Sequence, residues 1–392
     1  MKNDKSSTPL TYVEIDLRAI AYNVKQLQKI AGKNKFCLPS RPPSKKSKIA
    51  TEVLAVIKAD AYGHGSEHIS PLLEGVGVNF FGVSDITEGK QLRYCGIKKS
   101  ILLFESTIPS QVKEIVDYQL MPTVCTLDMA KALNRYAKSI KKQVDIHIKV
   151  DTGMGRLGVW HQEAFDFIRQ VYKCSRLRIM GIFTHFPSAD TDRRFTQKQI
   201  QFLYELVARL DKTGLVIPYI HAANSMGLTG YQTHVLNLAR PGLMLYGLYP
   251  HSSLVKAIKL KPAMRVKSLV ILVKDIKKGQ SVSYGRTFFT KKNMKIAVIP
   301  IGYNDGFFRA LSNKAEVLID GQRCRIVGRV TMDQIMVDVT DVLSIKIGSP
   351  VVIIGKQKKE YISADELAKH AGTINYEIVC ALGNHLMRVY KS

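Results

Sequence analysis

Apolar residues in the N-terminal two thirds of the chain follow a helical period in some segments and form short continuous runs in others. Residues 17–30 place apolar side chains at helical spacing between an N-cap candidate, Asp16, and Gly32, which predicts an amphipathic helix. Further along, short apolar runs alternate with longer helix-like segments, as in a parallel sheet with crossover helices. Strands are predicted at residues 53–58, 79–83, 100–104, 121–125, 144–150, 178–184, 218–221 and 241–246. Eight βα units in about 200 residues fit a closed (β/α)8 TIM-type barrel better than an open sheet.

After residue 262 the pattern changes to β-branched runs that are broken by turns, which predicts a mainly β domain. One helix is predicted there, at residues 363–371, because Ser363 and Glu366 have the spacing of a capping box. We therefore predict a barrel domain at residues 1–255 and a mainly β domain at residues 256–392.

Two segments of the predicted barrel domain depart from its pattern. A first strand at about residues 11–16 precedes the first helix and is able to pack with the C-terminal domain. Residues 37–48 are rich in Pro, Ser and Lys, which neither continue a helix nor suit a central strand. We expect them to form an exposed loop.

The composition is that of an ordinary globular protein, with 46% hydrophobic and 23% charged residues. No run approaches the roughly 18 consecutive apolar residues of a membrane span. The first residues also lack the apolar core of a signal peptide, so a cytoplasmic protein is expected. The six cysteines have the spacing of neither a zinc site nor a disulfide framework, and no metal is expected.

The charge is less ordinary, because 58 Lys and Arg against 32 Asp and Glu give a formal net charge of +26. A basic surface can mark a nucleic-acid or anionic-membrane partner. Here the lysines are spread along the chain in pairs, as at 98–99, 141–142 and 291–292. This distribution favours a generally basic surface, with no specific nucleic acid and no membrane as partners.

Residues of catalytic types follow the predicted barrel strands at their C-terminal ends, where such barrels place their active sites. They are Lys58 at the end of the first strand, Arg156 after the fifth, His185 after the sixth, Asn224 and Ser225 after the seventh and Tyr246 at the end of the eighth. Lys58 is either a nucleophile whose pKa burial lowers, as Schiff-base formation needs, or a lysine that extends to solvent.

Arg156 and His185 each leave two interpretations open as well. Arg156 lies in the glycine-rich segment KVDTGMGRLG and is either an anion ligand or a surface residue of a turn. His185 is either a catalyst or a packing residue. The segments YGHG and RPG resemble phosphate-binding turns but match neither the P-loop nor the dinucleotide fingerprint, which disfavours ATP and NAD.

Nine motifs distributed over nearly the whole chain resemble those of the alanine racemases, which are fold-type III pyridoxal-phosphate enzymes. They are AVIKADAYGHG, KVDTGMGRLG, GIFTHFPSAD, HAANS, RPGLMLYG, SVSYGRTF, IGYNDG, GRVTMDQ and TINYE, in the family's order and at about its spacing. The resemblance implies pyridoxal 5'-phosphate as cofactor and the interconversion of L-alanine and D-alanine. It also implies that the product D-alanine supplies cell-wall peptidoglycan.

The resemblance further implies roles for individual residues. Lys58 would carry the cofactor as a Schiff base and act as one acid/base, while Tyr284 from the second subunit of a homodimer would act on the opposite face of the substrate. The residues implied in cofactor binding are Lys58, Tyr62, His185, Asn224, Ser225, Arg240, Gly242, Leu243 and Tyr376. Those implied at the substrate are Arg156, Met332 and Tyr303, and Lys149 matches a lysine that is carbamylated in some members.

Some features depart from the family's pattern. Residues 37–48 resemble an insertion, Thr331 and Asn304 replace an expected Cys and Ala, and the end of the chain, LGNHLMRVY, is unusual. These departures concern substrate breadth more than reaction type. A broad-specificity racemase, a basic-amino-acid decarboxylase and a non-catalytic cofactor carrier stay open as alternatives, although SVSYG, MDQ and Tyr284 favour racemisation.

Overall fold

The computed structural model describes residues 9–33, 35–36, 49–231 and 235–392 of the chain. These residues form two compact units. One contains Ile20–Ala61 and Ser66–Lys261, and the other contains Tyr62–Gly65, Pro262–Ser392 and the described part of Met1–Ala19. We call them the barrel unit and the β unit. Among the described residues, no helix combines the length and the apolar character that crossing a bilayer requires.

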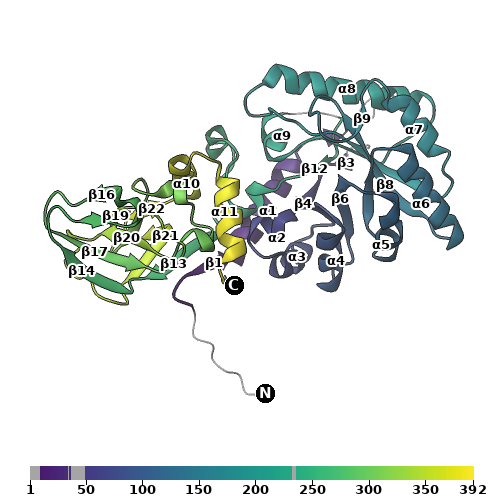
Figure 1. Ribbon diagram of the computed structural model, residues 1–392. Helices are drawn as coiled ribbons and strands as arrows, with labels where there is room; N and C mark the ends of the chain where they lie inside the picture. Colours follow the sequence, from purple (N-terminus) through teal and green to yellow (C-terminus); the bar gives the residue numbers. More distant parts are fainter. Residues whose placement is uncertain (1–8, 34, 37–48, 232–234) are drawn as a thin grey trace. The chain divides into compact units, whose positions relative to one another are not determined.

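Eight parallel strands of the described chain form the sheet of the barrel unit, in the order β11-β10-β8-β7-β6-β5-β4-β12. They are β4 (Glu52–Val56), β5 (Phe80–Val83), β6 (Ser100–Ser106), β7 (Met121–Val124), β8 (Val144–Asp151), β10 (Leu177–Phe183), β11 (Tyr219–His221) and β12 (Leu238–Ala239), and the short β9 (Val159–Trp160) pairs with β8. The two ends of this order are joined by backbone hydrogen bonds from Asn237 N to Ile220 O (3.0 Å) and from Arg240 N to Ala223 O (2.8 Å). The predicted barrel is confirmed as a nearly closed one (Figure 1).

Helices alternate with these strands and lie around the outside of the sheet (Figure 1). They are α1 (Leu17–Ala31), α3 (Ser66–Gly75), α4 (Ile86–Tyr94), α5 (Val112–Asp117), α6 (Leu127–Ser139), α7 (Ala164–Tyr172), α8 (Arg193–Lys212) and α9 (Ser225–Gly230). The helix predicted at 17–30 is therefore present, and Asp16 caps it by accepting a hydrogen bond from Ala19 N at 2.9 Å. The predicted loop at 37–48 lies outside the described residues, between the paired strands β2 (Lys35–Phe36) and β3 (Ile49–Ala50).

The prediction of the eighth strand at 241–246 is wrong. The strand is β12, a few residues earlier, and Leu243–Tyr246 form a 3₁₀ turn. Pro241 accepts a hydrogen bond from Val56 N at 3.0 Å but has no N–H to donate, so the strand pairing stops there. Tyr246 is fully buried in this turn, and its hydroxyl donates to Val56 O at 3.1 Å.

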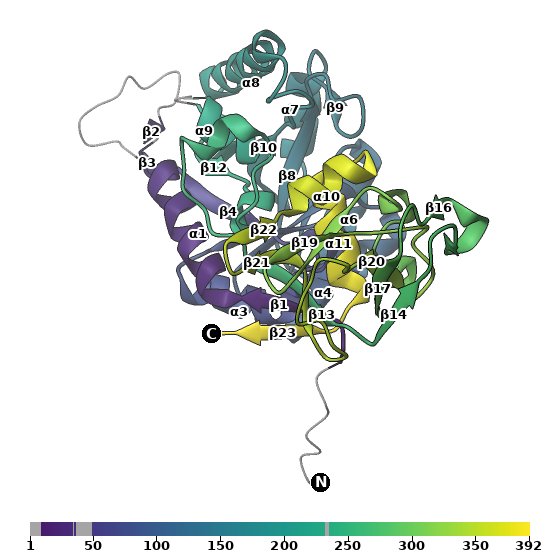
Figure 2. The same cartoon turned by 90° about the vertical axis from the view of Figure 1, so that its left-hand side faces the viewer.

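The β unit is mainly β, as predicted. Its largest sheet has the order β19-β18-β21-β13-β1-β23, with β22 on β21, and a second sheet has the order β14-β17-β20. The strands are β1 (Tyr12–Asp16), β13 (Met264–Leu269), β14 (Leu272–Ile276), β15 (Ser281–Val282), β16 (Phe288–Phe289), β17 (Met294–Ile299), β18 (Glu316–Ile319), β19 (Gln322–Arg325), β20 (Ile335–Asp338), β21 (Pro350–Gln357), β22 (Glu360–Ile362) and β23 (Arg388–Lys391). β1 lies antiparallel to β13 and parallel to β23, and the three are visible together in Figure 2.

Two helices belong to the β unit, although sequence patterns predicted only one. α10 (Ala364–Ala371) is the predicted helix, and Ser363 Oγ caps it by accepting from Glu366 N at 3.0 Å. α11 (Asn375–His385) was not predicted, because β-branched residues and Gly383 weaken its helical pattern. Gly383 nevertheless has a packing role, since a Cβ there would lie 2.1 Å from Gly63 O.

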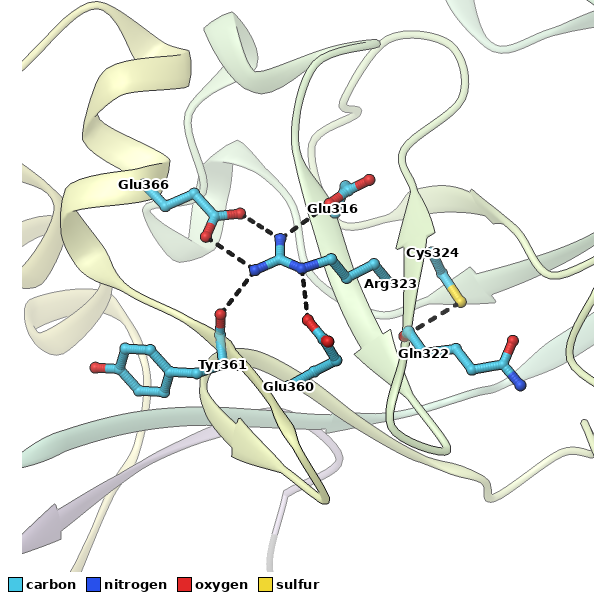
Figure 3. Close-up of polar contacts among 7 residues, drawn as sticks. All are labelled: Glu316, Gln322, Arg323, Cys324, Glu360, Tyr361 and Glu366. Carbon is cyan, nitrogen blue, oxygen red and sulfur yellow. Dashed lines mark hydrogen bonds and ion pairs between the residues drawn. The ribbon is translucent and has the colours of Figure 1, made fainter.

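In a complete capping box, the Glu366 side chain would also accept a hydrogen bond from Ser363 N. Here the Glu366 carboxylate belongs instead to an ion-pair network (Figure 3). The Glu366 carboxylate accepts from both terminal nitrogens of Arg323 on β19, at 2.6 and 3.2 Å. The same guanidinium donates to Glu316 on β18 (3.0 Å) and to Glu360 and the Tyr361 carbonyl on β22 (both 2.8 Å). Arg323 therefore ties three strands and a helix of the β unit together.

Candidate active site

The chain reverses direction immediately after Lys58 in a left-handed turn. The predicted strand 53–58 ends earlier than expected, at Val56, and residues 59–62 all have φ between 50° and 55°. L-residues adopt this conformation at a cost of about 1–2 kcal/mol each, so the surrounding structure has to impose it. Lys58 is thus placed at the C-terminal end of the first barrel strand, as predicted, but by a strained turn and not by the strand itself.

Two carboxylates of the barrel unit hold this turn in place. Glu88 on α4 accepts from Ala59 N and from Ser84 N, both at 2.7 Å. Burial raises the pKa of the Glu88 carboxyl, while these two backbone donors oppose that shift. Asp60 accepts from the backbone N (2.6 Å) and the hydroxyl (2.7 Å) of Ser66, the first residue of α3. Sequence reasoning missed both carboxylates, because the sequence around each is typical of an exposed helix or loop.

A chain of buried side chains crosses the barrel interior from Arg240. Arg240 is 4% exposed, and its Nη1 donates to Nδ1 of His221 at 2.9 Å. His221 Nε2 in turn lies 2.8 Å from Nδ1 of His147. Burial lowers the pKa of Arg240 to about 9, and burial together with the Arg240 charge lowers the pKa of His147 to about 3. Both imidazoles are therefore neutral at ordinary pH, with His221 presenting a lone pair to the arginine.

The other contacts of Arg240 are neutral as well. Its Nη2 donates to the carbonyls of Thr184 (2.8 Å) and Ala222 (3.1 Å). Within the described residues no carboxylate pairs with this guanidinium, and no partner of its Nε is found. A buried cation without a counter-charge is costly unless a ligand supplies one. The site is therefore suited to a group that accepts hydrogen bonds or carries negative charge.

Further cationic groups converge on the same end of the barrel. Burial first, and then the charges of Arg240, Lys149, Arg156 and Lys58, lower the pKa of His185 to about 2. Lys149 is 5% exposed, and its ammonium lies 4.5 Å from the centre of the Phe183 ring. Burial first, and then the charges of Arg240 and Arg156, place the Lys149 pKa well below its usual value. A neutral amine at this position is a nucleophile.

Asp151, which sequence reasoning missed, organises the loop that carries Arg156. One of its carboxylate oxygens accepts from the backbone N of Gly153, Met154 and Gly155 at 2.8, 2.9 and 3.2 Å. The other accepts from Arg156 N at 3.2 Å. The Arg156 side chain remains exposed at the mouth of the barrel unit. Asp151 lies within the glycine-rich motif KVDTGMGRLG, which could have pointed to it. Only the fold shows that it binds four successive N–H groups.

Four predicted cofactor-binding residues of the barrel unit, Asn224, Ser225, Gly242 and Leu243, lie together after β11 and β12. Asn224 caps α9 by accepting from Gly227 N at 2.9 Å, and Ser225 is the first residue of that helix. Ser225 Oγ accepts from Gly242 N at 3.3 Å, and Leu243 follows in the 3₁₀ turn. Tyr62 and Tyr376 belong to the β unit, where their ring centres lie 6.1 Å apart.

The remaining predicted residues, Tyr284, Tyr303 and Met332, are exposed on the β unit. The exposed fractions of their side chains are 68%, 43% and 53%. Backbone contacts hold two of them together, because Tyr303 N donates to Thr331 O at 3.1 Å and Asn304 N to Met332 O at 3.0 Å. Across residues 9–33, 35–36, 49–231 and 235–392, no group of His, Cys, Asp or Glu side chains could hold a metal ion.

These features define a (β/α)8-barrel enzyme with a cationic site at the C-terminal end of the barrel, followed by a mainly β domain. Family comparison agrees with this class: residues 44–250 match the alanine racemase N-terminal domain and residues 263–390 match the alanine racemase C-terminal domain. The chain belongs to the alanine racemase family, whose members are pyridoxal-phosphate-dependent racemases.

Individual relatives cover almost the whole chain. An alanine racemase of Halothermothrix orenii is 38% identical over 390 residues, which are 99% of each chain. The solved alanine racemase of Clostridium difficile 630 is 33% identical, with a TM-score of 0.87 over 98% of this chain and 97% of that one. The alanine racemase structure of Bartonella henselae with covalently bound pyridoxal phosphate is 28% identical, with a TM-score of 0.84 over 98% and 100%.

Proposed function

We propose that this protein interconverts L-alanine and D-alanine by a two-base mechanism that uses Lys58 and Tyr284. The observation that carries the proposal is the convergence of Lys58, Lys149, Arg156 and Arg240 around a neutral His185 at one end of the barrel. Such a site binds a doubly anionic cofactor and a substrate carboxylate, and it leaves an amine at the end of the first strand.

The residues of the barrel unit fit pyridoxal 5'-phosphate. Lys58 would bind it covalently, the Arg240 guanidinium would face its ring nitrogen, and Ser225, Gly242, Leu243, Tyr62 and Tyr376 would hold its phosphate, with His185 and Asn224 nearby. When bound, this group withdraws electrons from the substrate Cα and so acidifies its proton. The buried Arg240, which has no counter-charge among the described residues, supports this placement. Because arginine does not give up its proton, it would moderate that withdrawal and disfavour transamination.

Racemisation requires a proton to leave one face of Cα and another to arrive on the opposite face. We assign these transfers to the Lys58 Nζ and the Tyr284 Oη. Arg156 and the backbone N–H of Met332 would bind the substrate carboxylate, and Tyr303 together with Tyr376 would narrow the entrance. Each group acts by holding the carboxylate or by moving one proton, so the stereochemical outcome depends on their placement on two sides of Cα.

We further propose that two chains form a homodimer and that Tyr284 serves the site of the partner chain. The exposure of Tyr284, Tyr303 and Met332 supports this proposal, since a proton-transfer site works best where water is excluded. Burial against a second copy would remove water from all three side chains.

Lys149 is the candidate for carbamylation. Burial lowers the pKa of its amine and so favours the neutral form, which adds carbon dioxide and releases a proton, and the resulting carbamate would place a negative charge beside Arg156. We propose that this anion orients Arg156 toward the substrate carboxylate. D-alanine for cell-wall peptidoglycan is the purpose that we infer for the product.

The test is solvent-deuterium exchange at Cα of L-alanine and of D-alanine, with and without added pyridoxal phosphate. We expect both enantiomers to exchange and to interconvert only when the cofactor is present. Faster exchange of serine or lysine than of alanine would instead favour a broad-specificity racemase, which Thr331 and Asn304 raise as the second candidate. Carbon dioxide release from lysine or ornithine would favour a decarboxylase, and absence of any exchange would refute the proposal.

A further inference from the structure

Tyr284 lies in a short hairpin loop whose backbone is strained. The loop comprises residues 283–287 between β15 and β16, which pair through Ser281 with Phe289 and Val282 with Phe288. Ser283, directly before the tyrosine, has φ 65° and ψ −178°, a conformation that is populated almost only by glycine. A non-glycine residue persists there only where its surroundings impose the conformation.

The Ser283 side chain makes the contact that imposes it. Its hydroxyl donates to the backbone O of Arg329 at 2.6 Å. The close approach depends on Gly328, because a Cβ at that position would lie 2.7 Å from the Ser283 Cβ and 2.6 Å from Val282 O. On the other side of the loop, Asn313 accepts from Gly328 N at 2.6 Å and donates to the Thr287 hydroxyl at 3.1 Å. Both ends of the loop are therefore tied to the segment at 328–329.

The same segment leads directly to Met332, which is in turn fixed against the turn that carries Tyr303. A Cβ on Gly302 would lie 2.1 Å from Met332 O, so these two backbones are in direct contact. The hydrogen bonds from Tyr303 N to Thr331 O and from Asn304 N to Met332 O complete the contact. The Ser283 hydroxyl is thus the side-chain link next to Tyr284 between its loop and the frame that carries Met332 and Tyr303, while Asn313 provides a link at the other end of the loop.

We propose that Ser283 is a positioning residue, which fixes the Tyr284 phenol relative to the Met332 N–H. This inference rests on the proposed function, since it takes Tyr284 as an acid/base and Met332 as a carboxylate ligand. A hydroxyl that only stabilised the loop would change the melting temperature. One that positions Tyr284 changes kcat in preference to KM, because proton transfer is more sensitive to small displacements than carboxylate binding is.

Two substitutions separate the hydrogen bond from the backbone strain. Ser283→Ala removes the bond and keeps the steric cost, so the loop is expected to relax and Tyr284 to move. Ser283→Gly removes the bond as well, but glycine adopts the observed φ and ψ without strain. We expect kcat to fall about 10-fold in the alanine variant and about 3-fold in the glycine variant, with KM for alanine within about 2-fold of wild type. The control is Ser344→Ala, an exposed serine of the β unit whose hydroxyl contacts Asp320 and not the loop, for which kcat within about 2-fold of wild type is expected.

A second readout does not depend on activity or on the cofactor. Hydrogen–deuterium exchange in the cofactor-free protein reports the Arg286 N–H, which donates to Ser283 O at 3.3 Å. We expect its exchange to be fastest in Ser283→Ala, intermediate in Ser283→Gly and slowest in wild type and in Ser344→Ala. A wild-type protein that does not racemise alanine would refute the proposed function. The order of exchange given above would still support the role of Ser283 in fixing the loop.

The positioning role itself would be overturned by three results. One is wild-type kcat and wild-type exchange in Ser283→Ala. Another is a loss that lies entirely in KM, which indicates altered binding and not altered proton transfer. The third is an identical loss of kcat in the alanine and glycine variants together with unchanged loop exchange, which would separate the activity from the geometry of the loop. If Ser283→Ala does not fold, the glycine variant and its exchange rate decide between the same alternatives.

Discussion

The residues assigned to the site in the barrel unit and those in the β unit are stabilised in opposite ways. In the barrel unit, Lys149 and Arg240 are almost fully buried, and Arg240 is bound by neutral imidazole and carbonyl groups. In the β unit, Tyr284 and Met332 are more than half exposed and are fixed through backbone contacts. In the barrel unit, burial therefore shifts the pKa values of the charged groups. In the β unit, the contacts fix the positions of Tyr284 and Met332 but leave both side chains exposed to water. The composite site that we propose between two chains would account for both properties.

The sharpest test of this comparison uses one variant in each unit. We expect Lys58→Ala and Tyr284→Phe each to lower racemisation by about 10²-fold or more, because each removes an acid/base group. If Tyr284 serves the partner chain, mixing the two inactive variants and allowing the chains to exchange restores about one quarter of wild-type activity. Half of the dimers are then mixed, and each mixed dimer has one intact site.

The control for this experiment is the same mixture before the subunits exchange, which is expected to stay inactive. Lys58→Ala mixed with Lys291→Ala provides a matched mixture, because Lys291 is exposed and its alanine variant is expected to be active before any exchange. Absence of recovery after exchange, with dimers demonstrated by their mass, would show that both residues act within one chain. The exposed state of Tyr284 would then need another explanation.

The second prediction concerns the acid stability of the barrel unit. The pKa of His147 is lowered to about 3, and that of His221 is also well below its ordinary value of 6.5, because burial and the Arg240 charge oppose protonation. Below pH 6.5 the unfolded chain therefore binds protons that the folded chain does not, and stability falls as the pH falls. His147 by itself is expected to remove about 1.5 kcal/mol from the free energy of unfolding between pH 6.5 and pH 5, and His221 acts in the same direction.

Trp160, the only tryptophan of the chain, belongs to the barrel unit, so its fluorescence follows the unfolding of that unit in urea. His147→Gln is expected to reduce the pH-dependent loss without abolishing it, because His185 and His221 still contribute, whatever its effect on stability at pH 6.5. His251→Gln, at an exposed position of the same unit, is the control and should keep the wild-type pH dependence. An unchanged slope in His147→Gln would contradict a neutral buried imidazole.

The smallest effect is expected from the ion-pair network of the β unit. Arg323→Met removes one guanidinium from three carboxylates, but the side chain is about one third exposed and solvent screens the interaction. We expect a loss of roughly 1 kcal/mol that becomes smaller in high salt. Differential scanning calorimetry measures it, and Trp160 fluorescence should stay unchanged. Lys358→Met, which breaks the single pair with Asp320, is the control and should cost less.

Periodicity predicted the barrel and the mainly β domain because burial on one face imposes a period on the sequence. It placed the eighth strand too late, because Pro241 interrupts the pairing inside a continuous apolar run. It also missed α11, in which the close approach of the Gly63 backbone requires glycine at position 383 although glycine disfavours a helix. Local patterns carry information about local burial, and these two features depend on residues that are distant in the chain.

The sequence by itself determined the family, through nine motifs, and the types of residue that the site uses. The tertiary structure alone decided how those residues are prepared. The left-handed turn after Lys58 depends on Glu88, the neutral state of His147 depends first on burial and then on Arg240, and the strained backbone of Ser283 depends on Arg329. Each of these is a balance between burial or strain and a partner brought in by the fold, and no sequence spacing encodes such a balance.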